Sequence, residues 1–217
     1  YAWTFEVSTK TDDTPPVVVS VSPRDGSVGA RNTAVEVTFS EPMHPLAISG
    51  AFDGAAKTFR NIEVIDSGTN QTISGTYRLS NNYQTVSFVS GEACAEDLCG
   101  NTVFCLPENR SLQVQVHAAT VGAAAPQAQL IGGRFDGAVD ASQNSLDETR
   151  DYDRARPRET HLGSPADDVV WSFQTSGLLD RRTPEIAAIS PTLEAEFVNP
   201  DAPVQLTFSM PMLSSSL

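Results

Sequence analysis

Apolar and polar residues alternate one by one in several short segments of this chain. Residues 35–39 and 112–117 keep this alternation throughout, and residues 169–174 keep it except at Val170. A period of two predicts a β-strand with one face in a core and the other in water. The inward-facing row gives the predicted core residues, which are Val35, Val37, Phe39, Leu112, Val114, Val116, Trp171 and Phe173.

Weaker strand patterns cover residues 61–66, 73–79 and 84–89. Clusters of Asn, Gly, Ser and Pro separate these segments, as is typical of turns between strands. No long stretch keeps the 3.6-residue period of an amphipathic helix. The pattern therefore predicts an all-β fold, an antiparallel β-sandwich.

Three sequence segments from the first part of the chain return near its end in the same order. Repeated segments at a nearly constant spacing predict tandem units of one kind. The matching pairs are 1–5 (YAWTF) with 169–173 (VVWSF), 15–23 with 183–191, and 35–43 (VEVTFSEPM) with 204–212 (VQLTFSMPM).

The repeat predicts one complete domain between parts of two others. Each predicted linker leads into proline, which fixes φ and favours extended backbone before it, so we expect joints with limited swing, as in a rod or stalk. The predicted parts are the last strand of a preceding unit (1–9), a linker (10–16), a complete domain (17–176) with a cysteine loop (90–108) and an acidic insertion (122–168), a second linker (177–184) and the first strands of a next unit (185–217).

The composition and net charge of the chain argue against several classes of function. A hydrophobic content of 40% is enough to build a core. The formal net charge of −13 argues against binding to nucleic acid, which requires a basic surface, and against an anionic membrane surface. The apolar runs are far shorter than the ~20 residues of a membrane-spanning helix, so we expect no membrane insertion.

All three cysteines lie close together, at positions 94, 99 and 105. In an exported protein a local disulfide is the leading interpretation, with Cys94–Cys105 slightly preferred and Cys99 as another possible partner. Two alternatives stay open at this point. Three cysteines with His117 could hold Zn²⁺, or the thiols could be free.

The acidic insertion offers oxygen ligands at close spacing. Ca²⁺ takes six to eight oxygens, and a loop rich in Asp and Asn can supply them, although the spacing is not that of an EF-hand. The alternative is a solvated acidic loop, partly neutralised by nearby arginines. Asp12 and Asp13 could form a separate cation site. The predicted Ca²⁺ ligands are Asp136, Asp140, Asn144, Asp147, Asp151 and Asp153.

Catalytic motifs are missing from the sequence. It contains no G-x-S-x-G, H-E-x-x-H or Gly-rich phosphate loop, and its acid pairs are adjacent, unlike the separated carboxylates of glycosidases. We therefore expect that the chain is not an enzyme.

Several of these motifs together resemble a known family. The proline pair, the Val-Ser-Pro segment ending at Pro23, the Val-x-Val-Thr-Phe-Ser strand and the closing Trp171-Ser172-Phe173 are similar to bacterial Ig-like domains of the SbsA (Big_5) type, found in S-layer and other surface proteins. Members usually carry Asp-x-x-Gly-Asn before the last strand. Residues 140–144 match this with Gln143 in place of glycine, and residues 97–101 match it in full.

The resemblance implies an extracellular, non-catalytic module on a bacterial surface. The predicted function is a structural or adhesive stalk segment of a large secreted or cell-surface protein. Its expected partners are neighbouring Ig-like units of the same chain, with other surface proteins or glycans as further candidates. The alternatives are an accessory module of a secreted enzyme, acting as spacer or touching carbohydrate, and a subunit of an extracellular filament or sheath.

Overall fold

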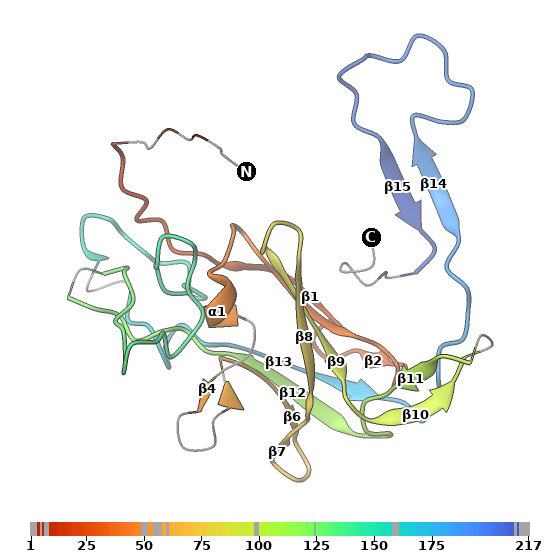
Figure 1. Ribbon diagram of the computed structural model, residues 1–217, viewed down its shortest axis with the longest axis horizontal. Coiled ribbons are helices and arrows are strands. Elements are labelled where there is room, and N and C mark those ends of the chain that lie inside the picture. The colour runs from red at the N-terminus through yellow and green to blue at the C-terminus, as the bar shows by residue number, and fades with distance from the viewer. Residues whose placement is uncertain are drawn as a thin grey trace.

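Two sheets packed face to face form the body of the protein (Figure 1). The computed structural model describes residues 4, 6, 9–48, 52–53, 58–59, 61–97, 100–123, 125–157, 161–210 and 212. The predicted strand at 1–9 falls largely outside these residues, as does Cys99. No helix among the described residues is long and apolar enough to cross a membrane.

The first sheet has four strands in the order β1-β3-β9-β8, all antiparallel. Alternation sets the register, because Val35 and Val37 of β3 oppose Phe88 and Val86 of β9 on the buried face. The bounds are β1 (Val18–Ser22), β3 (Val35–Phe39), β8 (Gly75–Ser80) and β9 (Thr85–Ser90).

The second sheet has five strands in the order β2-β13-β12-β6-β7. Its centre is the predicted pair of strands, with Val114 opposite Trp171 and Leu112 opposite Phe173. One pair departs from the antiparallel prediction, since β2 runs parallel to β13. The bounds are β2 (Val28–Gly29), β6 (Ile62–Asp66), β7 (Gln71–Thr72), β12 (Ser111–Val116) and β13 (Val169–Thr175).

The core lies between these sheets, and hydrogen bonds from one buried and one half-buried ring link them. All eight residues predicted for the core are buried, Trp171 being the most exposed of them at 5%. Trp171 Nε1 donates to the Pro23 carbonyl just after β1, and the Tyr77 hydroxyl donates to the Ile62 carbonyl in the opposite sheet. The predicted all-β antiparallel sandwich is confirmed, with the parallel pair β2–β13 as its exception.

The remaining elements are short. They are α1 (Pro45–Ile48) and three two-stranded pairs: β4 (Phe52–Asp53) with β5 (Thr58–Phe59), β10 (Ala93–Glu96) with β11 (Thr102–Phe104), and β14 (Ile186–Ser190) with β15 (Gln205–Phe208).

The described part of the acidic insertion contains isolated β-bridges in place of strands, yet it extends the core. Ala138 and Leu146 of the insertion, and Ala118 just before it, are fully buried in the same cluster as the sandwich residues. Small side chains let the backbone segments approach closely, and a Cβ at Gly137 would collide with the Ala118 carbonyl. The insertion is therefore a packed cap at one end of the sandwich.

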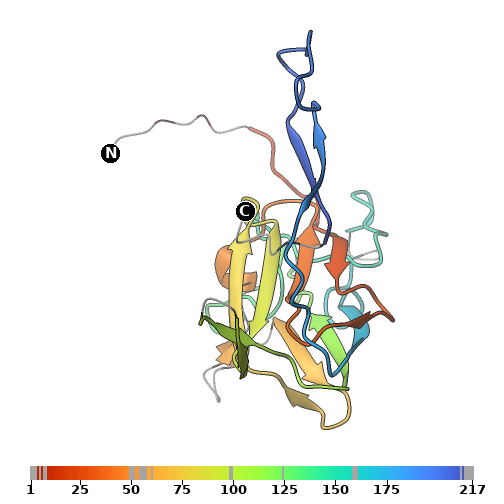
Figure 2. The same cartoon turned by 90° about the vertical axis from the view of Figure 1, so that its right-hand side faces the viewer.

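The hairpin β14–β15 stands apart from the sandwich in both Figure 1 and Figure 2. Its local structure repeats that of β1–β3. Ser40 N–H donates to the Val17 carbonyl, and Ser209 N–H donates to the Glu185 carbonyl. In both strand pairs the register shifts directly after the first paired residue, which is Val18 in β1 and Ile186 in β14. The second and third repeated sequence segments thus form the same pairing twice.

Candidate functional site

The segment that leads into the sandwich, residues 12–16, lies against the acidic insertion. Asp147 N–H donates to the Pro16 carbonyl at 2.9 Å, and Asn144 Nδ2 donates to the Thr14 carbonyl at 3.3 Å. Pro15 and Pro16 are buried. Since prolines also fix φ, this linker has a single extended path along the insertion. We call residues 12–16 together with Ser142, Asn144, Asp147 and Arg154 the N-terminal joint.

Side chains at the outer end of the N-terminal joint add polar contacts. Arg154 Nε lies 2.7 Å from Asp13 Oδ2, and Ser142 Oγ donates to Asp12 Oδ2 at 3.3 Å. The Arg154 side chain is 75% exposed, so this ion pair contributes little to stability. The buried backbone bonds near Pro16 therefore hold the joint more strongly than the surface charges do.

The turn that presents Asn144 to the linker occurs twice in the protein. Asp140 accepts the Asn144 N–H on Oδ1 at 2.7 Å and Asn144 Nδ2 on Oδ2 at 2.8 Å. Asp97 accepts the same two groups of Asn101 at 2.8 and 2.9 Å. The fourth residue of each turn has positive φ, 72° at Gln143 and 80° at Gly100. Both sequence matches to Asp-x-x-Gly-Asn thus share the same Asp–Asn hydrogen bonds and the positive φ of the fourth residue.

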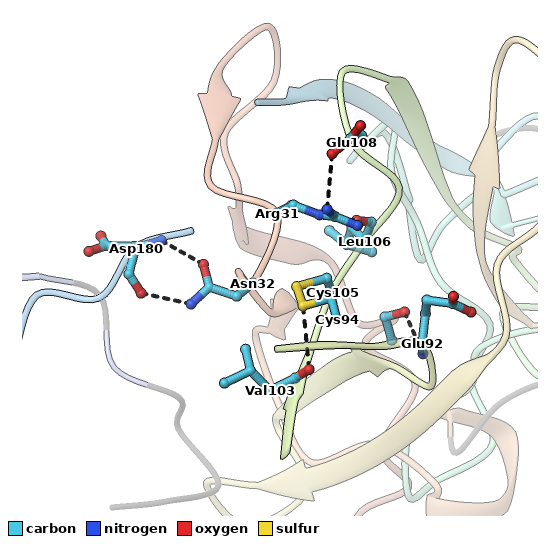
Figure 3. Close-up of a disulfide and its surroundings, with 10 residues drawn as sticks. Arg31, Asn32, Glu92, Cys94, Val103, Cys105, Leu106, Glu108 and Asp180 are labelled. Carbon is cyan, nitrogen blue, oxygen red and sulfur yellow. Dashed lines mark hydrogen bonds and ion pairs between the residues drawn. A yellow bond between two sulfur atoms is a disulfide. The ribbon is translucent and has the colours of Figure 1, made fainter. Parts of the chain in front are cut away.

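The segment that leaves the sandwich is held by Asn32, in the loop between β2 and β3 (Figure 3). Asn32 Nδ2 donates to the Asp180 carbonyl and Asn32 Oδ1 accepts the Asp180 N–H, each at 2.8 Å. Arg31 N–H donates to the Leu178 carbonyl at 3.0 Å. We call residues 31–32 with 178–180 the C-terminal joint.

The cysteine loop contacts the C-terminal joint through Arg31. Leu106 N–H donates to the Arg31 carbonyl at 2.7 Å, and Arg31 Nε donates back to the Leu106 carbonyl at 3.2 Å. Arg31 also forms an ion pair with Glu108 at 3.1 Å. Cys105, next to Leu106, is fully buried. The loop therefore fixes both the backbone and the side chain of Arg31.

The disulfide closes this loop. Cys94 in β10 is bonded to Cys105, which follows β11, with a Cα–Cα distance of 5.8 Å (Figure 3). The preferred pairing Cys94–Cys105 is confirmed. A zinc site of three cysteines with His117 is excluded, because two of its thiols form this bond. His117 instead lies between Asp168 and Glu63, at 2.9 and 3.6 Å.

The predicted Ca²⁺ ligands are distributed over separate local networks. Asp136 accepts the backbone N–H and the hydroxyl of Thr120, and Asp153 accepts the Ala155 N–H. Neither carboxylate belongs to a group of three potential ligand atoms within 4.8 Å among the described residues. Asp140 and Asn144 share one turn, and Asp147 and Asp151 share a contact with the Thr149 hydroxyl.

Two groups of three potential metal ligands lie close together in the described part of the chain. The first is Asp12, Glu41 and Asp140, where the N-terminal joint meets the end of β3. Burial, helped by the nearby charges of Asp140 and Asp12, raises the pKa of Glu41 to about 7. Burial also raises the pKa of Asp140, although the hydrogen bonds from Asn144 oppose this.

The second group is Asp147, His161 and Asp167, all of them buried. Burial lowers the pKa of His161, opposed by the charges of Asp167, Asp147 and Asp151. The sequence placed Asp147 in a candidate site but missed His161 and Asp167. No spacing rule joins them, because they meet only after the insertion folds back on itself.

Comparison with known protein families gives a match over most of the chain. The model of a family described as bacterial Ig-like domain matches residues 12–175. No curated protein matches the chain.

Similar solved structures are distant. The crystal structure of the S-layer protein rSbsC(31-844) is 12% identical, covering 82% of this chain and 15% of that one, with a TM-score of 0.37. The crystal structure of the N-terminal part of the bacterial S-layer protein SbsC is 13% identical, covering 80% of this chain and 25% of that one, with a TM-score of 0.38. The structure of surface layer protein SbsC, domains 1-6, is 11% identical, covering 82% of this chain and 27% of that one, with a TM-score of 0.30. The chain thus spans about a quarter or less of these proteins, and likeness at these scores carries no weight for function.

Proposed function

The chain belongs to the bacterial Ig-like domain family, whose model matches residues 12–175, and we propose that it is a structural segment of a bacterial surface protein, a stalk unit with fixed joints. In this function the sandwich sets the direction in which the chain enters and leaves it. Catalysis has no part in the proposal.

The observation that carries the proposal is that both linkers are bonded to the sandwich. The N-terminal joint lies on the insertion, at one end of the long axis, and the C-terminal joint lies beside the cysteine loop at the other end (Figure 1). A flexible tether between independent domains would need no such bonds, since Gly- and Ser-rich linkers behave as coils. Fixed attachment at opposite ends suits a unit that transmits extension along a rod.

The hairpin β14–β15 supports a tandem arrangement. Ile186 and Leu206 are 53% and 50% exposed, whereas Val18 and Val37, their counterparts in β1 and β3, are 8% and 2% exposed. In the complete domain these positions pack against the second sheet. We infer that β14–β15 begin a further domain of the same kind, which makes that domain the partner of the C-terminal joint.

The joint can be tested by ¹⁵N NMR relaxation of the whole chain. In the wild type the amides of residues 178–182 should show order parameters near those of the sandwich, about 0.85, and Asn32→Ala should lower them below about 0.6. Asn199→Ala is the matched control, because it removes only a hydrogen bond to Asp201 inside the far hairpin. Order parameters equally low in the wild type would refute a fixed joint.

The surface location needs a test of its own. Antibodies raised against the chain should label intact cells of the bacterium that produces it. Labelling that appears only after lysis would overturn the surface assignment and leave the joint geometry without this function.

A further inference from the structure

Three buried side chains of the insertion point at one another. Asp147, His161 and Asp167 are each exposed by 2% or less, and their potential ligand atoms all lie within 4.8 Å of one another. Among the described residues, neither carboxylate forms an ion pair with Lys or Arg. Buried carboxylates without a counter-charge are costly, so this arrangement calls for a positive partner.

The histidine supplies an independent observation. The side chain of His161 is fully buried, and among the described residues neither ring nitrogen meets the geometry of a hydrogen bond, although the Ser145 backbone lies near the ring. Nδ1 lies 3.8 Å from Asp167 Oδ2, too far for a hydrogen bond. A buried imidazole normally satisfies at least one nitrogen, and an unsatisfied lone pair beside two carboxylates is the arrangement of a metal ligand.

The carboxylates are held in place by the surrounding backbone. Asp167 Oδ2 accepts the Gly163 N–H at 2.7 Å, and Asp147 Oδ1 accepts the Arg150 N–H at 2.9 Å. The Thr149 hydroxyl lies within 3.0 Å of oxygens of Asp147, Asp151 and Asp167. One hydroxyl hydrogen serves only one of these three oxygens, so negative charge remains concentrated here.

We propose that Asp147, His161 and Asp167 bind a divalent transition-metal ion of the Zn²⁺ class. The donor set decides the class, because imidazole nitrogen with carboxylate oxygen suits Zn²⁺, whereas Ca²⁺ and Mg²⁺ take oxygen ligands. Two ligands of a tetrahedral Zn²⁺ lie about 3.3 Å apart. The ligand atoms lie within 4.8 Å of one another, so the groups need to close by about 1.5 Å or less. The ion would fasten the two ends of the segment 147–167 to each other.

The test is a Zn²⁺ titration of the whole chain by isothermal calorimetry, free of any histidine tag. Metal is first removed with a chelator, and the titration is run in millimolar Ca²⁺ so that all-oxygen sites are filled. One Zn²⁺ per chain is expected, and His161→Gln should weaken binding about tenfold or more. His117→Gln is the matched control, since His117 also lies near two carboxylates but directly follows β12, outside the proposed site. A folded wild type that binds no Zn²⁺, or an equal affinity in His161→Gln, overturns the proposal.

A second measurement covers the case in which His161→Gln does not fold. X-ray absorption of the Zn²⁺-loaded wild type should show a shell of one imidazole nitrogen with carboxylate oxygens. A shell without imidazole, or one containing sulfur, would overturn the assignment.

Discussion

Replacing Gln143 by glycine should stabilise the protein. Gln143 occupies the fourth position of the Asp140–Asn144 turn with φ of 72°, a conformation that costs a residue with a Cβ about 1–2 kcal/mol. Its side chain is exposed, so removing it empties no buried space. Glycine also makes the unfolded chain freer, which opposes the gain by about 0.4–1 kcal/mol. The balance is a stabilisation of about 0.5–1 kcal/mol.

Gly100 occupies the same position in the other turn and allows the reverse substitution. Its φ is 80°, and a Cβ there would meet nothing within 4 Å, so Gly100→Ala should destabilise through the backbone alone, by about 0.5–1 kcal/mol. Gln127→Gly is the control for glycine at an ordinary φ. This residue is exposed and bridges to the same turn, and its replacement should destabilise by about 0.5–1 kcal/mol.

Urea unfolding of the three variants and the wild type provides the assay, with the midpoint compared at equal slope. In a chain of this size the gain from Gln143→Gly corresponds to about 2 °C in melting temperature. A loss of stability in Gln143→Gly, or a gain in Gly100→Ala, would refute the argument that backbone conformation governs these turns.

Four further predictions concern the rest of the molecule. Trp171→Ala should lose about 3–5 kcal/mol by leaving a cavity, as calorimetric unfolding measures, and a variant that melts cooperatively near the wild-type temperature would contradict its place in the core. Cys94→Ala should lose about 3 kcal/mol in urea unfolding, because the disulfide closes a loop across 11 residues, and an unchanged midpoint would count against this. Burial raises the pKa of Glu41 to about 7 in the folded protein, from 4.5 for an unburied glutamate, so the folded state binds more protons between these values. Stability measured in EDTA should therefore fall as pH rises from 4.5 to 7, and Glu41→Gln should flatten that slope. Ca²⁺ remains a prediction for the oxygen ligands of the insertion: calorimetric unfolding should show a higher melting temperature in millimolar Ca²⁺ than in EDTA, equivalent to about 2.7 kcal/mol at a hundredfold excess over Kd, and no shift would leave the acids as solvated surface.

Patterns that depend on near neighbours were readable from the sequence. Alternation identified the strands and their buried row, because successive side chains of any strand point to opposite faces. The turns at 97–101 and 140–144 are equally local, since their hydrogen bonds join residues four apart. The equivalence of β14–β15 with β1–β3 also follows from repeated residues. The short strands β2 and β7, at the two sheet edges, carry too few residues for a period to be visible.

The acidic insertion shows where sequence reasoning stops. Its composition of small, polar and acidic residues resembles a solvated loop, yet Ala138 and Leu146 are fully buried, and only the packing of backbone segments explains this burial. The same chain path separates Asp136 and Asp153 from the other acids while bringing His161 to Asp147 and Asp167.

The sequence by itself determined the all-β class, the core residues, the two Asp-to-Asn turns and the repeated hairpin, because each depends on side-chain periodicity or on contacts within a few residues. Only the tertiary structure decided the pairing of Cys94 with Cys105, the bonding of Asn32 to Asp180 and the meeting of His161 with two aspartates. Asn32 and Asp180 are distant in the chain, and Cys94 and His161 each had several possible partners, so in each case the packing of the whole domain selects the partner.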